Sequence, residues 1–305
     1  MIKLEAIIYN LPPVRAVRNV TRRIFIPGFG KMSLYEVGRF FLKGLWNSKM
    51  NERCAAVTYN FLMAIPPTLL FLFSLVPYLP LENAQDTILY TLRLITPNEN
   101  AYTNVSSIII DFMNKEQTGV LSIGILFTLF FSSNGMLALI RSFERASHIY
   151  RTRSGLRKRW TAIKLTVMLI LVALLSLAVL IIQSEAVNEL ILSIFNNTII
   201  VRLLSIAIII FIILFAISVI YTYGPSLKHR MKFFSPGSIF ATFLSVATTT
   251  VFYFLVNNFI NYSKVYGSIG TLMAFMVWLW LNTMVILVGY ELNVSIILAK
   301  NANEE

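Results

Sequence analysis

Residues 266–297 read YGSIGTLMAFMVWLWLNTMVILVGYELNVSII, and this stretch decides the fold. After its opening Tyr-Gly-Ser the stretch stays apolar for far longer than a helix in a soluble core needs, and its single carboxylate is Glu291. An apolar run of about 18 residues or more indicates a bilayer span, because about 20 residues of helix cross about 30 Å of hydrocarbon. The sequence therefore predicts an integral membrane protein.

The composition of the whole chain agrees with this prediction. Hydrophobic residues make up 57% of the 305 residues and charged residues 13%, and the mean hydropathy is +0.72. A water-soluble domain would struggle to cover so much apolar surface. Because Cys54 is the single cysteine, an intramolecular disulfide is excluded. His148 and His229 do not form a His/Cys cluster with the spacing of zinc ligands. We expect an all-α, polytopic membrane helix bundle with no metal site and no cofactor.

Six apolar stretches are long enough to span a bilayer, and basic segments alternate with less basic ones between them. If the chain starts in the cytoplasm, the outer segments carry only Arg93, Lys115, Arg202 and Lys264, and every other Lys and Arg is inside. This asymmetry is what the positive-inside rule requires, so we expect both termini to be cytoplasmic. The predicted spans are residues 57–79, 119–139, 165–183, 199–221, 237–255 and 266–297.

Three segments follow from this topology: a basic cytoplasmic segment over 1–54, a membrane domain over 55–300 and a short tail over 301–305. In the first segment, Ser33 and Glu36 fit a capping box, so a helix should begin there. Its apolar side either lies in the lipid interface or packs on the protein's own surface. That side carries Leu34, Val37, Phe41 and Leu45. In the membrane domain, the extracytoplasmic loop 81–117 should form two short amphipathic helices, which could cap the membrane domain or lie in the interface.

Pro66 and Pro67 lie near the middle of the first span. Neither proline has an amide proton, so the carbonyls of Leu62 and Met63 lose their usual donors. In hydrocarbon such carbonyls need another partner, which predicts a helix that is kinked or broken against neighbouring helices or a polar cavity. A packed kink without any role in transport is the alternative.

A polar stripe continues from the second span into the basic loop. Asn134, Arg141, Arg145 and His148 fall on one side of a helix, which favours either an entry path for anions or interface anchoring with an Arg141–Glu144 pair. Basic side chains near the surface attract anionic headgroups at about 1 kcal/mol each. We therefore expect membrane lipids as partners and no specific nucleic acid. The candidate headgroup ligands are Arg145, Arg151, Arg153, Arg157, Lys158 and Arg159.

The last span has two polar sides. Asn282, Gly289 and Asn293 share one stripe, whereas Glu291 lies about 180° from Asn282 at about 100° per residue. Either the stripe is a close helix contact and Glu291 alone faces a partner or cavity, or the helix is broken. Glu291 could pair with Arg141, carry a proton, approach the interface or hold two helices together. The candidate translocation residues are Asn60, Pro66, Pro67, Ser132, Asn134, Arg141, Tyr253, Asn257, Asn282 and Glu291.

Several blocks of the chain are similar to one bacterial family. These blocks are residues 55–59 before the proline-containing span, residues 132–145 (SSNGMLALIRSFER), residues 221–225 before Pro236-Gly237, and residues 266–270 through Trp278 to Gly289, Glu291 and Leu292. From about residue 34 onward, the chain resembles the YihY or BrkB-like inner-membrane proteins, some of which carried the label ribonuclease BN. The resemblance implies about six spans but no settled activity.

Three functions remain open on the sequence. The polar groups within spans favour a transport-type protein that handles a lipid or another amphiphilic, anionic substrate. A noncatalytic membrane scaffold in envelope assembly is the alternative, because polar residues also join membrane helices without any substrate. A ribonuclease is a minor alternative, because the inner segments carry only scattered Glu and His residues with no catalytic spacing. We therefore predict no catalytic residues.

Overall fold

The computed structural model describes residues 19–30, 32–46, 49–75, 118–144, 149–182, 198–228, 231–258 and 268–304, together with residues 89, 93, 102, 103, 106, 107 and 110. Within these ranges all regular secondary structure is helical, which confirms the all-α prediction. Two isolated β-bridges join loop residues. The loop 81–117, with its two predicted helices, lies almost entirely outside the described residues.

Each predicted span coincides with one long helix, and several helices continue beyond the apolar run. α8 begins ten residues before its predicted span, because charged residues at its start continue the helix without adding hydropathy. The long helices are α4 (Met50–Leu75), α7 (Thr118–Phe143), α8 (Gly155–Ile182), α10 (Thr198–Tyr223), α11 (Pro236–Asn258) and α13 (Ser268–Glu304). A shorter helix, α3 (Leu34–Trp46), precedes them.

Five of these helices are long and apolar enough to cross a membrane within the described residues. The qualifying segments are Leu126–Phe143, Gly155–Ser176, Ile206–Tyr223, Pro236–Val256 and Leu272–Asn303. The chain is thus a helical membrane protein, whereas a count of six spans and the sidedness of the termini stay predictions.

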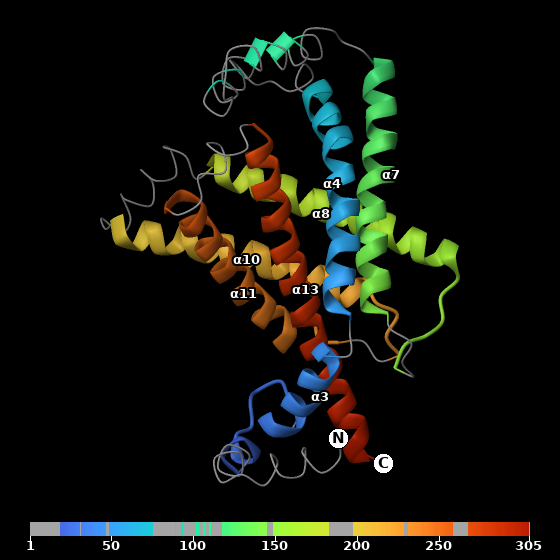
Figure 1. Cartoon of the computed structure of the whole chain (residues 1–305), viewed down its shortest axis with the longest axis vertical. Coiled ribbons are helices and arrows are strands. Elements are labelled where there is room, and N and C mark those ends of the chain that lie inside the picture. The colour runs from blue at the N-terminus through green and yellow to red at the C-terminus, as the bar shows by residue number, and fades with distance from the viewer. Residues whose placement is uncertain are drawn as a thin grey trace.

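The helices are arranged around α13 (Figure 1). α4 and α7 stand side by side as an antiparallel pair, and α13 packs against α11, α3 and α4. α8 and α10 run across the direction of this pair, with α8 in contact with α7 and α10 in contact with α8 and α11. α13 is therefore the element that connects α3 to the rest of the molecule.

α4 is one continuous helix through its two prolines, so the first span is not broken, whereas a kink stays a prediction. Hydroxyl groups supply hydrogen bonds close to the prolines. Thr68 donates to the carbonyl of Ala64 at 2.7 Å, and Thr128 of α7 donates to the carbonyl of Pro67 at 2.8 Å. A neighbouring helix can satisfy carbonyls near a proline, and this is why a membrane helix tolerates one.

The predicted capping box starts α3. The amide and hydroxyl groups of Ser33 both donate to Oε2 of Glu36 at 2.9 Å, and the amide of Glu36 donates to the Ser33 hydroxyl at 3.3 Å. Of the two surfaces proposed for the apolar side of α3, the structure shows the protein's own. Val37 is 1% exposed and packs in a small core with Phe29 and Ala299.

The two basic connections α7–α8 and α10–α11 meet at one end of the helices. The Tyr150–Leu227 bridge is antiparallel, and the amide of Arg151 donates to the carbonyl of Ser226 at 2.7 Å. The amide of Lys228 likewise donates to the carbonyl of Ile149 at 2.9 Å. Both connections were predicted on the same side of the membrane, and they do lie together. We call this the basic end.

Candidate functional site at the basic end

Glu291 is the buried carboxylate of α13, with 4% of its surface exposed. It faces α3, because a Cβ atom added to Gly44 would overlap Oε1 of Glu291. Only a glycine leaves room for such a close approach. The hydroxyl of Ser295, one turn further along α13, donates to the main-chain carbonyl of Glu291 at 2.8 Å. The result is a carboxylate that α3 covers.

The opposite side of α13 forms a contact with α11 that we call the α11 seam. Small residues recur every four positions on α11, a spacing that lets membrane helices approach closely. A Cβ atom on Gly289 would lie 2.5 Å from Cβ of Ala241 and 2.8 Å from the carbonyl oxygen of Gly237. The seam consists of Gly237, Ala241, Ser245 and Thr249 on α11 and of Trp278, Asn282, Gly289 and Asn293 on α13.

Hydrogen bonds run along the middle of the α11 seam. The hydroxyl of Ser245 donates to Oδ1 of Asn282 at 2.7 Å, and Nε1 of Trp278 donates to the hydroxyl of Thr249 at 3.3 Å. Nδ2 of Asn282 also donates to the carbonyl of Trp278 at 3.0 Å. The side chain of Asn282 is therefore satisfied by two helices of this chain.

The start of α11 completes the seam. The amide of Gly237 donates to Oδ1 of Asn293 at 2.8 Å, and Nδ2 of Asn293 donates to the hydroxyl of Ser235 at 2.8 Å. Pro236 occupies the first helical position, where its missing amide proton costs least. α13 is continuous here, so the alternative of a broken helix is wrong, and the stripe with Gly289 is a close helix contact.

Aromatic rings gather around Tyr290, and one guanidinium joins α4 to α7. The rings of Phe143 and Tyr290 have centroids 4.1 Å apart, and the rings of Tyr221 and Tyr290 5.5 Å. The hydroxyl of Tyr150 lies 3.3 Å from that of Tyr290. Arg53, at the start of α4, donates to the main-chain carbonyl of Ser142. α4, α7, α10 and α13 are therefore joined around Tyr290, the residue before Glu291.

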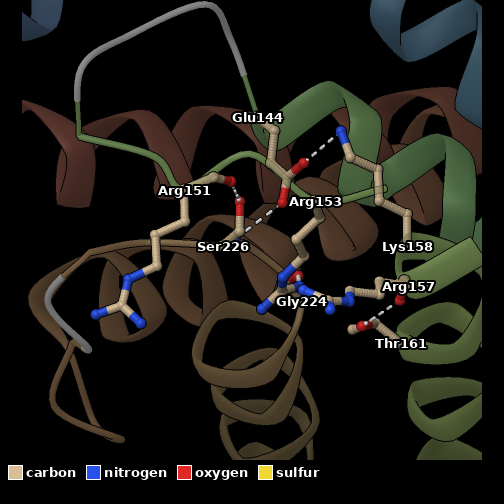
Figure 2. A network of polar contacts seen from close by, with 8 residues as sticks. All are labelled: Glu144, Arg151, Arg153, Arg157, Lys158, Thr161, Gly224 and Ser226. Atoms are coloured by element: carbon tan, nitrogen blue, oxygen red, sulfur yellow. Dashed lines mark hydrogen bonds and ion pairs between the residues drawn. The ribbon is translucent and has the colours of Figure 1, made fainter. Parts of the chain in front are cut away.

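A second polar network connects α7, α8 and the α10–α11 connection (Figure 2). Nζ of Lys158 lies 2.6 Å from Oε2 of Glu144, and the amide of Ser226 donates to Oε1 of the same carboxylate at 2.9 Å. The side chain of Arg153 donates to the carbonyl of Gly224 at 3.0 Å, just beyond the end of α10. A cation is favourable there, because free carbonyls give a helix C-terminus a partial negative charge.

Comparison with known proteins shows the family of the chain. The sequence pattern of the family described as Virulence factor BrkB matches residues 41–305. The chain belongs to this family. The match confirms the resemblance that the sequence showed, and it includes α3 from Phe41 onward together with every long helix.

Relatives of this BrkB-family chain are found in several bacteria. A ribonuclease-like protein, YfkH, from Bacillus subtilis (strain 168) is 31% identical over 266 residues, which are 83% of this chain and 94% of the relative. A UPF0761 membrane protein from Haemophilus influenzae (strain 86-028NP) is 24% identical over 263 residues, 86% of this chain and 95% of the relative. No solved structure matches the chain.

Most of the predicted headgroup ligands contact other parts of the BrkB-family chain. Lys158 and Arg153 have the partners given above, and a side-chain nitrogen of Arg151 donates to the carbonyl of Lys228 at 3.2 Å. Arg159 donates to Oδ1 of Asn134 and lies over the ring of Phe130, 4.7 Å from its centroid. Arg157 is a surface residue beside Arg153 in Figure 2, and Arg145 lies outside the described residues.

The predicted translocation residues do not gather around one point. Asn60 donates to the carbonyl of Ala56 in its own helix at 2.8 Å, Pro66 is exposed, and Tyr253 is 69% exposed on α11. Arg141 is exposed, and among the described residues no ion pair joins it to Glu291 or Glu144. Pro67 and Asn134 bind α7 and α8 side chains, and Ser132 is half-buried. The side chain of Asn257, like His148, lies outside the described part.

Sequence reasoning missed the residues that pack against α13. Gly44 carried a weak signal, since it lies seven residues after Val37 on the apolar side of α3 and so faces the same way. The four-residue spacing of small side chains on α11 was also visible. Arg53 and the three tyrosines near Phe143 carried no signal, because only the tertiary arrangement brings them together.

Proposed function

We propose that this chain is a transport-type protein of the bacterial inner membrane, with both termini cytoplasmic, that moves a lipid or another amphiphilic, anionic substrate. The observation that carries the proposal is Glu291, a carboxylate with 4% exposure in a helix of a membrane protein. Ionisable groups inside membrane proteins are expensive and mark substrate paths or proton relays by default. Glu291 is therefore the residue on which substrate or proton movement depends.

Access to Glu291 would come from α3. Its inner side lies on α13 and makes one ring contact with α11, in which Phe41 and Phe240 have centroids 6.4 Å apart. A helix of 13 residues that packs mainly on one neighbour moves at lower cost than a span packed on several sides. Displacement of Gly44 would expose the carboxylate without opening the α11 seam.

The basic end supports an anionic substrate. Arg141, Arg151 and Arg157 are exposed there, while Glu144 is occupied by Lys158 and Ser226. Exposed cations next to a membrane raise the local concentration of anionic headgroups. A phospholipid would then meet positive charge before it reaches the covered carboxylate.

The test is transport in proteoliposomes with fluorescent phosphatidylglycerol, a labelled organic anion and a labelled ion as probes. We expect the wild type to move at least one of them and Glu291→Gln to lose about tenfold or more of the rate, as expected for a proton-transfer group. Glu52→Gln is the matched control, because its carboxylate is 72% exposed and pairs with Lys49 at 3.6 Å. A wild type that moves no probe, or a Glu291→Gln variant with the wild-type rate, would contradict the proposal.

The second candidate is a noncatalytic membrane scaffold in envelope assembly. It is favoured by the use of Asn282, Asn293 and Arg159 in contacts between helices of the chain itself. For a scaffold, a strain without the gene is rescued by Glu291→Gln and by Arg141→Ala, but not by changes in the basic α7–α8 connection. For a transporter, Glu291→Gln fails to rescue.

The description of the relative YfkH as ribonuclease-like motivates a third, minor candidate, ribonuclease activity. In the described part of the chain, no three His, Cys, Asp or Glu side chains are close enough to hold a metal ion. Purified protein, free of contaminating nucleases and assayed on RNA with and without divalent metal, tests this candidate. Cleavage that follows the protein through purification would establish it.

A further inference from the structure

α3 presents a second face that the described residues of the protein do not cover. Leu42 is 67% exposed and Trp46 is 92% exposed, although both are large and apolar. At about 100° per residue, Trp46 lies about 180° from Val37, the most buried residue of the helix. The apolar side predicted from the sequence is thus occupied by α13, and a different aromatic side points away from the protein.

Two cations accompany these apolar side chains. Arg39 and Lys43 are exposed and fall within about 60° of Trp46 around the helix axis. We call Arg39, Leu42, Lys43 and Trp46 the outer face of α3. In the short helical segment 19–23, the guanidinium of Arg22 lies 5.1 Å from the ring centroid of Tyr35, so a third cation is nearby. Apolar and aromatic side chains flanked by cations are typical of helices that lie in an anionic lipid interface.

The position of α3 in the fold agrees with such an interface. α3 ends at Trp46, and α4 begins at Met50 with the charged residues Glu52 and Arg53 in its first turn. Trp46 is therefore close to the point where the chain enters its first predicted span. Figure 1 shows α3 beside the lower part of α13, just beyond the ends of α4 and α7. A tryptophan at that level is expected among headgroups.

We propose that the outer face of α3 docks on the anionic surface of the lipid bilayer. Leu42 and Trp46 enter the boundary between headgroups and acyl chains, while Arg39 and Lys43 contact lipid phosphates. A second copy of this chain is a poorer partner, because two outer faces would bring four cations together. This inference does not depend on transport, since a scaffold would be anchored in the same way.

Spin labelling tests the proposal on the full chain in lipid nanodiscs. The single cysteine, Cys54, is buried and is left in place, and unmodified protein measures background labelling. Leu42→Cys reports on the outer face, and Ala302→Cys, exposed near the end of α13, is the matched aqueous control. The probes are oxygen, which enters the bilayer, and a water-soluble nickel chelate, which does not.

In nanodiscs with phosphatidylglycerol, we expect the label at position 42 to collide with oxygen more than with nickel, and the label at 302 to show the reverse. Arg39→Glu with Lys43→Glu should remove the preference at position 42. The proposal is overturned if position 42 resembles position 302, or if its accessibility is the same in purely zwitterionic lipid. Spin–spin broadening that disappears on dilution with unlabelled protein would overturn it in favour of a second copy.

Discussion

The two sides of α13 differ in how tightly they pack against their neighbours. Toward α11, Gly289 approaches the backbone of Gly237, and hydrogen bonds between small residues close the contact. Toward α3, the same helix buries the carboxylate of Glu291 beneath a single glycine. The α11 seam leaves backbone atoms no freedom, whereas the α3 contact involves the end of a flexible side chain. We infer that the seam holds the fold and that the α3 side is the part able to move.

The most severe way to break the seam is a methyl group at Gly289. In Gly289→Ala the new Cβ would lie 2.5 Å from Cβ of Ala241 and 2.7 Å from the Tyr221 hydroxyl, which donates to the carbonyl of Ile286 at 2.5 Å. We expect a loss of about 1–3 kcal/mol, because tightly packed helices must separate. Thermal melting of the purified protein in detergent measures the loss.

Gly38→Ala is the control for the Gly289 substitution. Gly38 lies in α3 with open space around the position of a new Cβ atom. Its replacement should stabilise the helix by up to about 1 kcal/mol through helix propensity alone. Equal melting temperatures for the two alanine variants would show that the α11 seam is looser than described.

Removing the side chain of Asn293 breaks the same seam at its polar end. Asn293→Ala leaves the buried amide of Gly237 without its partner and removes one of the hydrogen bonds that the Ser235 hydroxyl accepts, which costs about 1–3 kcal/mol. Asn60→Ala is the matched control, because its amide contacts only its own helix in an exposed position. We expect that control to change stability by less than about 0.5 kcal/mol. The opposite order would contradict the proposed role of Asn293.

The substitution Gly44→Ala tests the other side of α13, where it contacts α3. Gly44→Ala would overlap Oε1 of Glu291, but this side chain can turn aside, so we expect a smaller loss of about 1 kcal/mol. The loss should vanish when Glu291 is alanine as well, because the two positions are in contact. A double-mutant cycle on melting measures this coupling, and strictly additive effects would place Gly44 away from the carboxylate.

The smallest expected effect concerns the start of α3 and depends on pH. The Ser33 main-chain amide donates to Glu36 and, as the largest influence, holds the pKa of that carboxyl below its ordinary value of 4.5. A lowered folded-state pKa means that the stabilisation is present above the unfolded value and is lost as the pH falls through the folded value. Because Glu36 is largely solvated, the effect should stay below about 0.5 kcal/mol.

Hydrogen exchange of the first turn of α3 between neutral and acidic pH measures this loss, after correction for the intrinsic exchange rate. In Glu36→Gln the protection should no longer depend on pH. A pH dependence that persists in Glu36→Gln would assign the titration to another group.

The sequence predicted the long helices well and their partners poorly. Apolar runs such as residues 266–297 reveal a span by themselves, because a helix that crosses the hydrocarbon of the bilayer must be apolar over its whole length. The basic turn before Lys164 continues α8 without any hydropathy signal, so the helix start was placed too late. For α3, periodicity identified an apolar side but not its partner, since lipid and protein interiors are equally apolar.

The candidate site was predictable in part. Glu291 stood out because a carboxylate in a span is rare, and its position opposite Gly289 followed from helix geometry. Its cover, Gly44, comes from a distant part of the chain, and no local pattern announces such a contact. The pairing of Lys158 with Glu144, instead of Arg141 with Glu144, likewise depends on how α8 crosses α7.

The length and continuity of α13 restrict how the covered carboxylate becomes accessible. The helix has 37 residues, so it extends about 55 Å as one rod. Any rotation of this rod that turned Glu291 away from α3 would drive Gly289 out of its fitted contact with α11. The α11 seam thus prevents α13 from rotating about its own axis. We therefore expect α3, and not α13, to move if Glu291 becomes accessible.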